Sequence, residues 1–291
     1  MNIVITIPAF NEEKTLPSVL TELKQVMNAT SYRYKILILD DGSRDRTVDV
    51  ARAHGAIVVS HRHKGLAETF KAEMRECLRL NADIIVHTDA DGQYHPKHIP
   101  ELIEKIRQGY DLVLGSRFRG KIEQMPLMKR LGNIAFSHAI SSLTEVKITD
   151  STTGFRAFTA EVAREINYIN TFTYTQEQII KASKQGFSIT EIPIIARKTR
   201  ASRLFKSPLQ YAIKAWINIL RIYRDYDPLK FFGYVGGTLF GLGFILGIAI
   251  LIRILITGGA GGVPRVILSS LLLLVGIQVI TFGFLADMLK R

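Results

Sequence analysis

The sequence predicts an α/β fold, a mainly parallel sheet with helices on both faces, followed by an amphipathic helix and a two-helix membrane hairpin. Three observations support this prediction. Short β-branched apolar runs alternate with amphipathic stretches through the first two-thirds of the chain. Several of these runs end in polar turns, as strands do where they carry a ligand site. Near the C-terminus, two uncharged runs of 22 and 21 residues follow one another, Phe231–Ile252 and Val266–Ala286.

The individual elements follow from length and periodicity. Seven short runs have the β-branched composition of strands: Asn2–Ile7, Lys35–Leu39, Ala56–Val59, Asp83–Thr88, Asp111–Gly115, Gly154–Phe158 and Ser188–Ile194. Six stretches carry apolar residues at helical spacing: Thr15–Met27, Arg46–His54, Leu66–Leu80, Pro96–Gln108, Pro126–Ser142 and Tyr174–Lys184. Because strands and helices alternate, we expect parallel pairing, with ligands bound beyond the carboxyl ends of the strands.

The two uncharged runs are long enough to cross a bilayer, since each spans about 30 Å as a helix. A buried core helix is the alternative for either run alone, but two runs in succession favour a transmembrane hairpin. The connector between them is short and rich in glycine, and Pro264 is placed to begin the second helix. We expect spans at about 231–253 and 265–287, within a membrane region of residues 229–291.

The segment Ser207–Tyr226 precedes the first span and has apolar residues at helical spacing. It is either a surface helix packed on the domain or a helix lying in the membrane interface. Its aromatic and basic residues, Trp216 and Arg221 among them, favour the interface. The expected organisation is a domain of residues 1–206, an interfacial helix region at 207–228 and the hairpin.

The net charge of +12 is concentrated before the membrane region. Between Arg197 and Lys230 there are nine Lys or Arg residues and two Asp residues. Nucleic acid is one partner for a basic stretch, but the adjoining spans favour anionic lipid instead. The positive-inside rule then places the N-terminal domain in the cytosol, although Arg265 in the connector weakens the contrast. The single cysteine, Cys77, excludes an intrachain disulfide and fits a reducing compartment.

The segment Val86–His95 carries the strongest sign of chemistry. It leaves an apolar strand and delivers two carboxylates, Asp89 and Asp91, separated by the small residue Ala90. Oxygen ligands at a strand end suit a hard divalent cation such as Mg²⁺ or Mn²⁺, which can neutralise a departing diphosphate. The alternative is a solvated acidic turn. Two other strands also end in polar turns, at Asn11-Glu12 and at Asp40-Asp41, so three strands are expected to deliver polar groups to one edge.

The order of short motifs along the chain resembles a known family. PAFNE, DDGSRD, GLAE, DADGQ, GSR, TTGFR and a basic Ser-containing segment follow one another as in glycosyltransferase family 2, which has the GT-A fold. The pattern is most similar to the branch of dolichol-phosphate mannose synthases and polyprenyl-phosphate glycosyltransferases. The resemblance covers residues 1–203, and the hairpin matches branch members with two C-terminal spans.

The resemblance implies an inverting transferase that uses Mg²⁺ or Mn²⁺. It would transfer a sugar from a nucleotide diphosphate to dolichyl or polyprenyl phosphate in the bilayer. The first expectation is mannose, with GDP-mannose as the donor. The family's donor-binding positions match Pro8, Phe10, Glu12, Asp40, Asp41, Asp89, Ala90, Asp91, Gln93, Arg200 and Arg203. Of these, Asp89, Asp91 and Gln93 match the metal-binding element. Phe10 stands where the family usually has Tyr, so a hydroxyl contact is lost.

The acceptor phosphate is expected to meet Arg117, with Arg130 as a second clamp and Ser137 a third contact. Guanidinium groups suit phosphate because their forked donors bind two oxygens at once. The alternative for Arg130 is a plain surface charge. Asp89, Asp91 and Arg117 are the expected catalytic residues.

Two further parts of the family pattern are not among the expected catalytic or binding residues. Asp150 precedes the TTGFR motif and Arg156 is its last residue, and we expect the two to shape the acceptor pocket or to pair with each other. Glu177 occupies the position of a general base in the wider family. A lipid monophosphate is already largely a dianion at neutral pH, so the branch does not need that base.

Other functions stay open at this point. UDP-glucose or UDP-N-acetylglucosamine would use the same metal site, and a non-catalytic membrane module that binds nucleotide sugars is a rival of another class. A processive polysaccharide synthase is disfavoured, because Trp216 is not in a QxxRW motif and only two spans are present. The oligomeric state, homo-oligomer included, is not determined by the sequence.

Overall fold

In the computed structural model of the chain, the described residues are 1–166, 174–198, 208–260 and 262–289. They fall into two compact units, Met1–Ala212 and Ile213–Arg291. The first unit contains the sheet and the candidate site. The second contains most of one amphipathic helix and two long apolar helices.

The first unit is built on a seven-stranded sheet with the order β3-β2-β1-β4-β6-β5-β7. Every neighbouring pair is parallel except the two that involve β6, which runs against β4 and β5. The prediction of a mainly parallel sheet is therefore confirmed. The strands are β1 (Asn2–Ala9), β2 (Arg33–Asp40), β3 (Ile57–Ser60), β4 (Ile84–His87), β5 (Leu112–Ile122), β6 (Arg156–Thr159) and β7 (Ile189–Ala196).

The sheet topology brings three carboxyl ends together. In the register of the central strands, Ala9 of β1 pairs with Asp40 of β2, and Thr6 of β1 pairs with His87 of β4. The loops that leave β1, β2 and β4 therefore emerge at the same edge, as expected from the polar turns.

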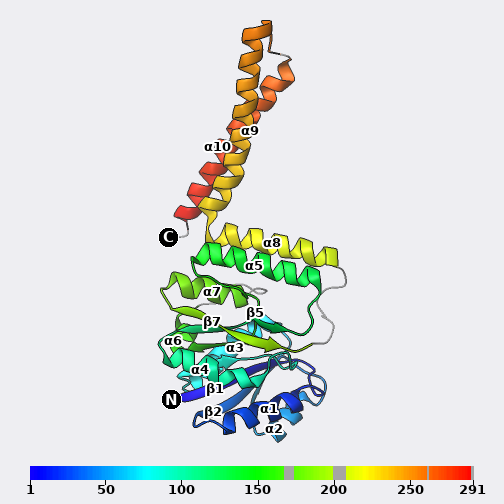
Figure 1. The fold of residues 1–291 in the computed structure, drawn as a ribbon, viewed down its shortest axis with the longest axis vertical. Helices are drawn as coiled ribbons and strands as arrows, with labels where there is room; N and C mark the ends of the chain where they lie inside the picture. The colour runs from blue at the N-terminus through cyan, green and yellow to red at the C-terminus, as the bar shows by residue number, and fades with distance from the viewer. Residues whose placement is uncertain (167–173, 199–207, 261, 290–291) are drawn as a thin grey trace. The chain divides into compact units, whose positions relative to one another are not determined.

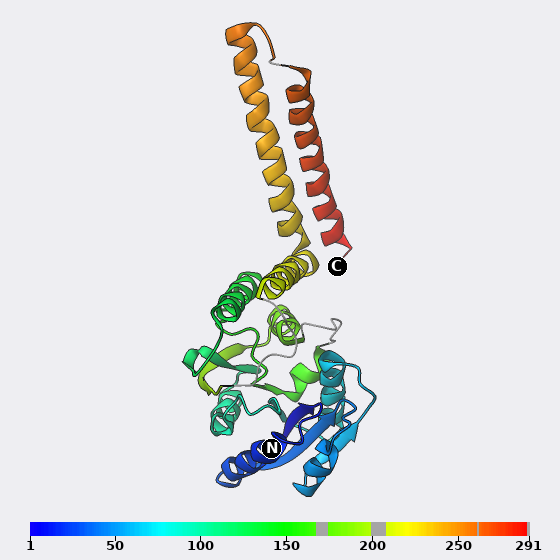
Figure 2. The same cartoon turned by 90° about the vertical axis from the view of Figure 1, so that its right-hand side faces the viewer.

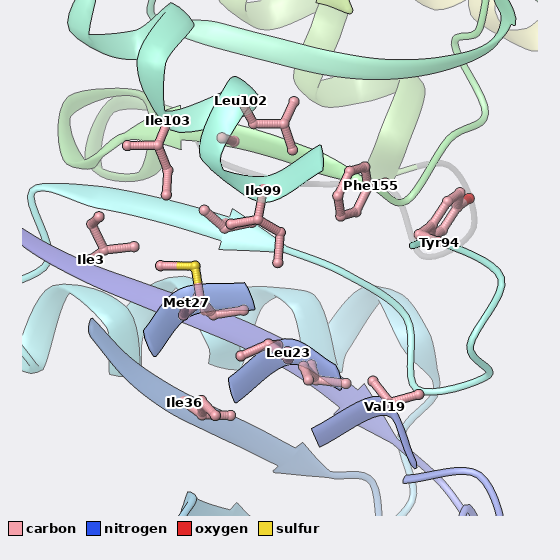
Figure 3. Close-up of a cluster of buried hydrophobic side chains, with 14 of the residues drawn as sticks. Ile3, Val19, Leu23, Met27, Ile36, Tyr94, Ile99, Leu102, Ile103 and Phe155 are labelled. Carbon is pink, nitrogen blue, oxygen red and sulfur yellow. The ribbon is translucent and has the colours of Figure 1, made fainter. Parts of the chain in front are cut away.

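Helices cover both faces of the sheet (Figure 1). The described helices of this unit are α1 (Leu16–Asn28), α2 (Thr47–Ala53), α3 (Leu66–Arg79), η1 (Pro96–His98), α4 (Ile99–Arg107), α5 (Leu127–Thr144), α6 (Ala160–Glu165) and α7 (Tyr174–Lys184). Alternate residues of a strand point to opposite faces. Ile3, Ile5 and Ile7 of β1 accordingly join a buried cluster with side chains of α1 and α4 (Figure 3). Thr6 points to the other face, where it contacts Glu73 of α3.

Three elements differ from the sequence prediction. β5 extends beyond Gly115 to Ile122, because it pairs with β7 past an irregularity between Ser116 and Lys121. The helix expected at Pro96–Gln108 begins with the 3-10 turn η1. The short helix α6 was not predicted, since six residues are too few for a periodic signal.

The chain continues with α8 (Pro208–Tyr226), α9 (Pro228–Thr257) and α10 (Val263–Met288). The helices α9 and α10, of 30 and 26 residues, are long and apolar enough to cross a membrane. In their most apolar windows only 11% and 17% of the residues are buried, which is unlike the core helix of a soluble domain. Figures 1 and 2 both show α9 and α10 side by side, as expected for a hairpin.

Glycines allow the backbones of α9 and α10 to approach closely. A Cβ added at Gly236 would lie 2.6 Å from the Gly276 carbonyl oxygen, and one at Gly276 would lie 2.7 Å from the Phe240 nitrogen. Ser269 of α10 also donates a hydrogen bond of 2.8 Å to the Gly243 carbonyl of α9. Small residues and a polar contact between helices are the features that hold helices together in lipid.

Candidate active site

The loop after β4 presents the two carboxylates of the DADGQ segment. Its turn is stabilised locally, since Asp91 Oδ1 accepts a hydrogen bond of 2.9 Å from the Gln93 nitrogen. The Gln93 carbonyl in turn accepts a hydrogen bond of 2.9 Å from the Arg197 nitrogen, just after β7. The loop is therefore anchored to the beginning of the basic segment that follows the sheet.

Asp89 is half-buried and lies against the turn at Gly154. A Cβ added to Gly154 would lie 2.8 Å from Asp89 Oδ2 and 3.0 Å from Oδ1. Burial and the nearby charge of Asp91 raise the pKa of Asp89 to about 6. Two carboxylates in this environment repel each other, and a bound cation would relieve that repulsion.

Arg117 lies within β5 rather than after it, and only 3% of its surface is exposed. Its Nε donates to Asp150 Oδ2 at 2.7 Å and its Nη2 donates to Asp150 Oδ1 at 2.8 Å. Nη2 also donates to the Thr152 hydroxyl at 2.8 Å. One edge of the guanidinium is thus fixed by the loop that carries the TTGFR motif.

The remaining nitrogen of Arg117, Nη1, donates no hydrogen bond to the residues that the structure describes. Burial lowers the pKa of Arg117, but Tyr94 and Asp150 outweigh it and raise the pKa above the usual value, so the group stays charged. Asp89 contributes to the same electrostatic environment. Arg117 therefore offers a positioned cation beside the acidic pair.

Lys129 is a second cation near the acidic pair, and the sequence prediction missed it. Burial and Arg117 lower the pKa of Lys129, while Asp91, Asp150 and Asp89 act in the opposite direction. Its neighbour Arg130 is exposed. Helical periodicity could have shown the difference, since Lys129 lies one turn before the buried Asn133, whereas Arg130 lies one turn before the exposed Ile134.

On the side of β2, two aspartates hold the surrounding loops. The buried Asp40 accepts a hydrogen bond of 3.0 Å from the Ser43 nitrogen. Asp41 accepts from the backbone nitrogens of Lys64 and Gly65 at 2.8 and 3.0 Å, and its Oδ2 lies 2.8 Å from His63 Nδ1. Asp41 therefore organises the loop before α3.

The ring of Phe10 stacks on His63 with centroids 4.4 Å apart. Gly42 is required between these loops, because its φ is +77° and an added Cβ would lie 2.8 Å from the His63 nitrogen. Phe10, Asp40 and Asp41 thus belong to one cluster at the ends of β1 and β2.

Three other residues that were expected to bind the nucleotide-sugar donor lie in different surroundings. Glu12 is buried and accepts a hydrogen bond of 2.6 Å from the Thr15 hydroxyl at the start of α1. Pro8 lies within β1, opposite Leu39 of β2. Ala90 is buried in the main apolar cluster, so it anchors the loop between the two aspartates.

Ser137 of α5 is buried, and its hydroxyl supports the loop before Gly154. It accepts a hydrogen bond of 2.9 Å from the Ser151 nitrogen. The expected pairing of Asp150 with Arg156 is wrong. Asp150 binds Arg117, whereas Arg156 donates to Gln178 Oε1 at 2.9 Å and to the Thr175 carbonyl at 3.0 Å. Arg156 is fully buried on β6, and its guanidinium also donates to the Thr153 carbonyl in the preceding turn.

Glu177 is buried in α7 and forms an ion pair of 2.8 Å with Lys181. Arg200 and Arg203, expected near the donor diphosphate, lie outside the described residues. The described chain reaches Lys198, whose nitrogen donates to Glu123 Oε2 at 3.0 Å.

The acidic pair fits a divalent cation that takes some of its ligands from the protein and the others from a substrate. Among the described residues, no group of three His, Cys, Asp or Glu side chains could hold a metal ion alone. Mg²⁺ commonly binds through one or two carboxylates and completes its coordination with substrate phosphates and water. Asp89 and Asp91 suit that mode, and Gln93 is the adjacent amide.

Comparisons with known proteins agree with this geometry. The profile described as "Glycosyl transferase family 2" matches residues 4–166. The dolichyl-phosphate hexose transferase of Haloferax volcanii is 32% identical over 197 residues, covering 68% of this chain and 83% of the relative. The undecaprenyl-phosphate mannosyltransferase of Micrococcus luteus is 30% identical, covering 67% of this chain and 83% of that relative.

A solved structure shares the fold. The glucosyl-3-phosphoglycerate synthase of Mycobacterium tuberculosis, in complex with Mn²⁺, uridine diphosphate and phosphoglyceric acid, superposes with a TM-score of 0.60 at 20% identity. The match covers 76% of this chain and 77% of that one. The sheet, the acidic loop after β4 and the family match together lead to one conclusion: the chain belongs to glycosyltransferase family 2.

Proposed function

We propose that the protein transfers a sugar from a nucleotide diphosphate donor to dolichyl or polyprenyl phosphate at the cytosolic face of a membrane. The observation that carries the proposal is that the acidic pair Asp89 and Asp91 shares one electrostatic environment with Arg117 and Lys129. A site with both charges can hold a metal-bound diphosphate and a second, phosphate-bearing substrate. The relatives named for transfer to dolichyl and undecaprenyl phosphate support the same acceptor class.

The reaction forms one bond and breaks one bond at the anomeric carbon of the sugar. An oxygen of the lipid phosphate attacks that carbon, and the bond from the carbon to the diphosphate oxygen breaks with inversion. The attacking phosphate is largely dianionic at neutral pH, so it needs no base. Glu177, in its ion pair with Lys181, is consequently not assigned a proton-transfer role.

The residues of the chain would act mainly by positioning and by charge. A divalent ion held by Asp89 and Asp91, with Gln93 beside them, would neutralise the departing diphosphate. Nη1 of Arg117 and the amine of Lys129 would bind the acceptor phosphate, with Arg130 at the periphery and Ser137 supporting the adjacent loop. Phe10, Asp40 and Asp41 would face the nucleoside, within a donor site that includes Pro8, Glu12 and Ala90.

The donor is proposed to be GDP-mannose, in line with the mannosyltransferase relative. UDP-glucose and UDP-N-acetylglucosamine are the alternatives, because a metal site of this type contacts the diphosphate rather than the sugar. Mg²⁺ and Mn²⁺ both suit the carboxylate ligands.

The test is incubation of membranes containing the protein with a panel of labelled nucleotide sugars, one polyprenyl phosphate and either metal. We expect labelled glycolipid with at least one donor, and a loss of about 100-fold or more for Asp91→Ala, the scale of removing one group that stabilises developing charge. Unchanged transfer by Asp91→Ala would refute the metal site. Tight donor binding without product would instead favour a non-catalytic binding module.

A further inference from the structure

A chain of buried polar groups lies behind the acidic loop, on the face of the sheet that α3 covers. The Thr6 hydroxyl of β1 donates to Glu73 Oε1 of α3 at 2.8 Å. Glu73 Oε2 lies 3.3 Å from Nε2 of His87, the last residue of β4. Nδ1 of the same ring lies 2.7 Å from the Gly154 carbonyl oxygen. Thr6, Glu73 and His87 are each fully buried.

One ring nitrogen of His87 forms a hydrogen bond with Gly154, and the other lies within ion-pair distance of Glu73. The Gly154 carbonyl can only accept, so Nδ1 carries a hydrogen and donates it. Nε2 lies 3.3 Å from Oε2 of the Glu73 carboxylate, within ion-pair distance, and neither atom forms a hydrogen bond with another described residue. The ring also packs against Phe70 and Tyr174, with centroids 5.2 and 5.9 Å away. The orientation of His87 is therefore determined on every side.

Gly154 connects this chain of groups to the candidate metal site. Its backbone lies against the Asp89 carboxylate, with room for a hydrogen but not for a Cβ, which would lie 2.8 Å from Oδ2. On the other side, the Gly154 nitrogen donates a hydrogen bond of 3.1 Å to the Tyr94 hydroxyl. His87 holds the carbonyl of this glycine and Tyr94 holds its nitrogen, so the surface behind Asp89 cannot shift freely.

The stability of the fold does not by itself require an ionic pair at the position of Glu73 and His87. Burying two charges costs several kcal/mol per ion by desolvation, and apolar replacements of similar volume are often neutral or stabilising. The surroundings on this face of the sheet include the apolar rings of Phe70 and Phe158, whose centroids lie 6.4 Å apart. A directed hydrogen bond to Gly154 is what an apolar residue at position 87 could not supply.

We propose that Glu73 and His87 are positioning residues that orient the Asp89 carboxylate for metal binding by fixing the turn at Gly154. The inference rests on the metal site of the proposed function and extends it to two residues that touch no substrate. Supporting residues of this kind typically change metal affinity by 10- to 100-fold when they are mutated.

The test measures Mn²⁺ binding to the full-length, detergent-solubilised protein by electron paramagnetic resonance, with GDP and with UDP in parallel samples. We expect His87→Leu to raise the dissociation constant for Mn²⁺ about tenfold. His87→Asn retains a donor near the position of Nδ1, so we expect it to bind Mn²⁺ within about threefold of the unmutated protein. Glu73→Gln, whose amide can donate to Nε2 and whose oxygen can accept from Thr6, is also expected to preserve binding.

A control separates this role from a general loss of stability. Ile103→Ala removes a fully buried side chain of α4 on the opposite face of the sheet and should lower thermal stability by a cavity effect. It should leave Mn²⁺ affinity unchanged at temperatures where the protein stays folded. The proposal is overturned if His87→Leu binds Mn²⁺ normally, or if Ile103→Ala weakens binding as much as His87→Leu does.

The same samples distinguish failure of the proposed metal site from failure of the positioning role alone. If the unmutated protein and Asp91→Asn bind Mn²⁺ equally, the metal site itself is refuted, and the positioning role falls with it. If Asp91→Asn abolishes binding and His87→Leu does not weaken it, only the inference about Glu73 and His87 is wrong.

Discussion

At the scale of single residues, the chemistry of Asp89 is set by its surroundings. Burial and the adjacent Asp91 raise its pKa to about 6, so the neutral form persists well above the usual range of an aspartate. A metal ion binds the ionised carboxylate and competes with the proton. The acidic pair should therefore respond to pH in a range where ordinary aspartates are already ionised.

The first prediction concerns this competition. We expect the association constant for Mn²⁺ to be constant above about pH 7 and to fall by about tenfold per pH unit below about pH 6. Electron paramagnetic resonance of the full-length protein between pH 5 and 8 measures it. Asp89→Asn, which has no carboxylate to titrate there, should bind weakly and show a flatter profile. An affinity that does not change between pH 5 and 7 would contradict the prediction.

A second prediction compares two neighbouring cations of α5. Lys129 shares its electrostatic environment with Asp91 and Arg117, whereas Arg130 is exposed. We expect Lys129→Met to raise the KM for polyprenyl phosphate about tenfold, the loss of a charge-assisted hydrogen bond, and Arg130→Met to raise it less than about threefold. Steady-state kinetics with varied acceptor provide the measurement. Equal effects of the two substitutions would argue against the assignment of Lys129.

The third prediction tests the buried pair of Arg117 and Asp150. Asp150→Asn leaves the guanidinium buried without its anion, and breaking such a pair costs about 3 kcal/mol of unfolding free energy. Urea denaturation followed by circular dichroism reports the change. The double variant Arg117→Met with Asp150→Asn should recover part of the loss, because the stranded charge is gone. If Asp150→Asn is as stable as the unmutated protein, the pair does not hold Arg117 as described.

At the scale of elements, the hairpin of α9 and α10 depends on close contact at glycines rather than on apolar burial. Lipid tails are as apolar as leucine, so the hydrophobic effect does not drive helices together in a bilayer. Backbone approach at Gly236 and Gly276 and the hydrogen bond from Ser269 to the Gly243 carbonyl supply specific contacts. The position of each glycine, and not the number of glycines, decides the packing.

Adjacent glycines of α9 provide a matched test of this view. A Cβ at Gly236 would meet the Gly276 carbonyl, whereas one at Gly237 has nothing within 4 Å. Both substitutions to Leu raise helix propensity equally, so only Gly236→Leu should separate the helices. We expect faster hydrogen exchange in α9 and α10 for Gly236→Leu and no change for Gly237→Leu, measured by mass spectrometry in detergent. Equal exchange in the two variants would exclude close packing at Gly236.

At the scale of the whole molecule, the distribution of charge determines the expected topology. Basic residues cluster between Arg197 and Lys230, before the first apolar helix, and Lys290 and Arg291 follow the second. The positive-inside rule therefore favours a cytosolic catalytic domain and a connector on the opposite side of the membrane. A cytosolic site would have direct access to water-soluble nucleotide sugars.

Labelling of single cysteines tests that topology. In a Cys77→Ala background, Gly259→Cys in the connector should react with a membrane-impermeant maleimide in intact cells. Lys198→Cys at the end of the sheet domain should react only after the membrane is opened. The reverse pattern would place the domain outside the cytosol and would separate it from its proposed donor.

Much of the fold and the position of the acidic site could be predicted from the sequence alone, because the signals for them are local or periodic. Alternating strand and helix patterns predicted the mainly parallel sheet, and two long uncharged runs predicted α9 and α10. The spacing of Asp89 and Asp91 after an apolar strand predicted a polar site at the carboxyl edge, since parallel strands bring their ends together.

Only the tertiary structure decided which side chains meet across the sheet. Asp150 binds Arg117 instead of Arg156, and the acidic pair influences the pKa of Lys129, whereas Arg130 is exposed. The contact of Glu73 with His87 joins α3 to β4 through side chains that sequence analysis did not connect. Partners that are distant along the chain leave no periodic or local signal. Their choice depends on the register of β5 against β7 and on the rotation of α5, which packing of the whole domain determines.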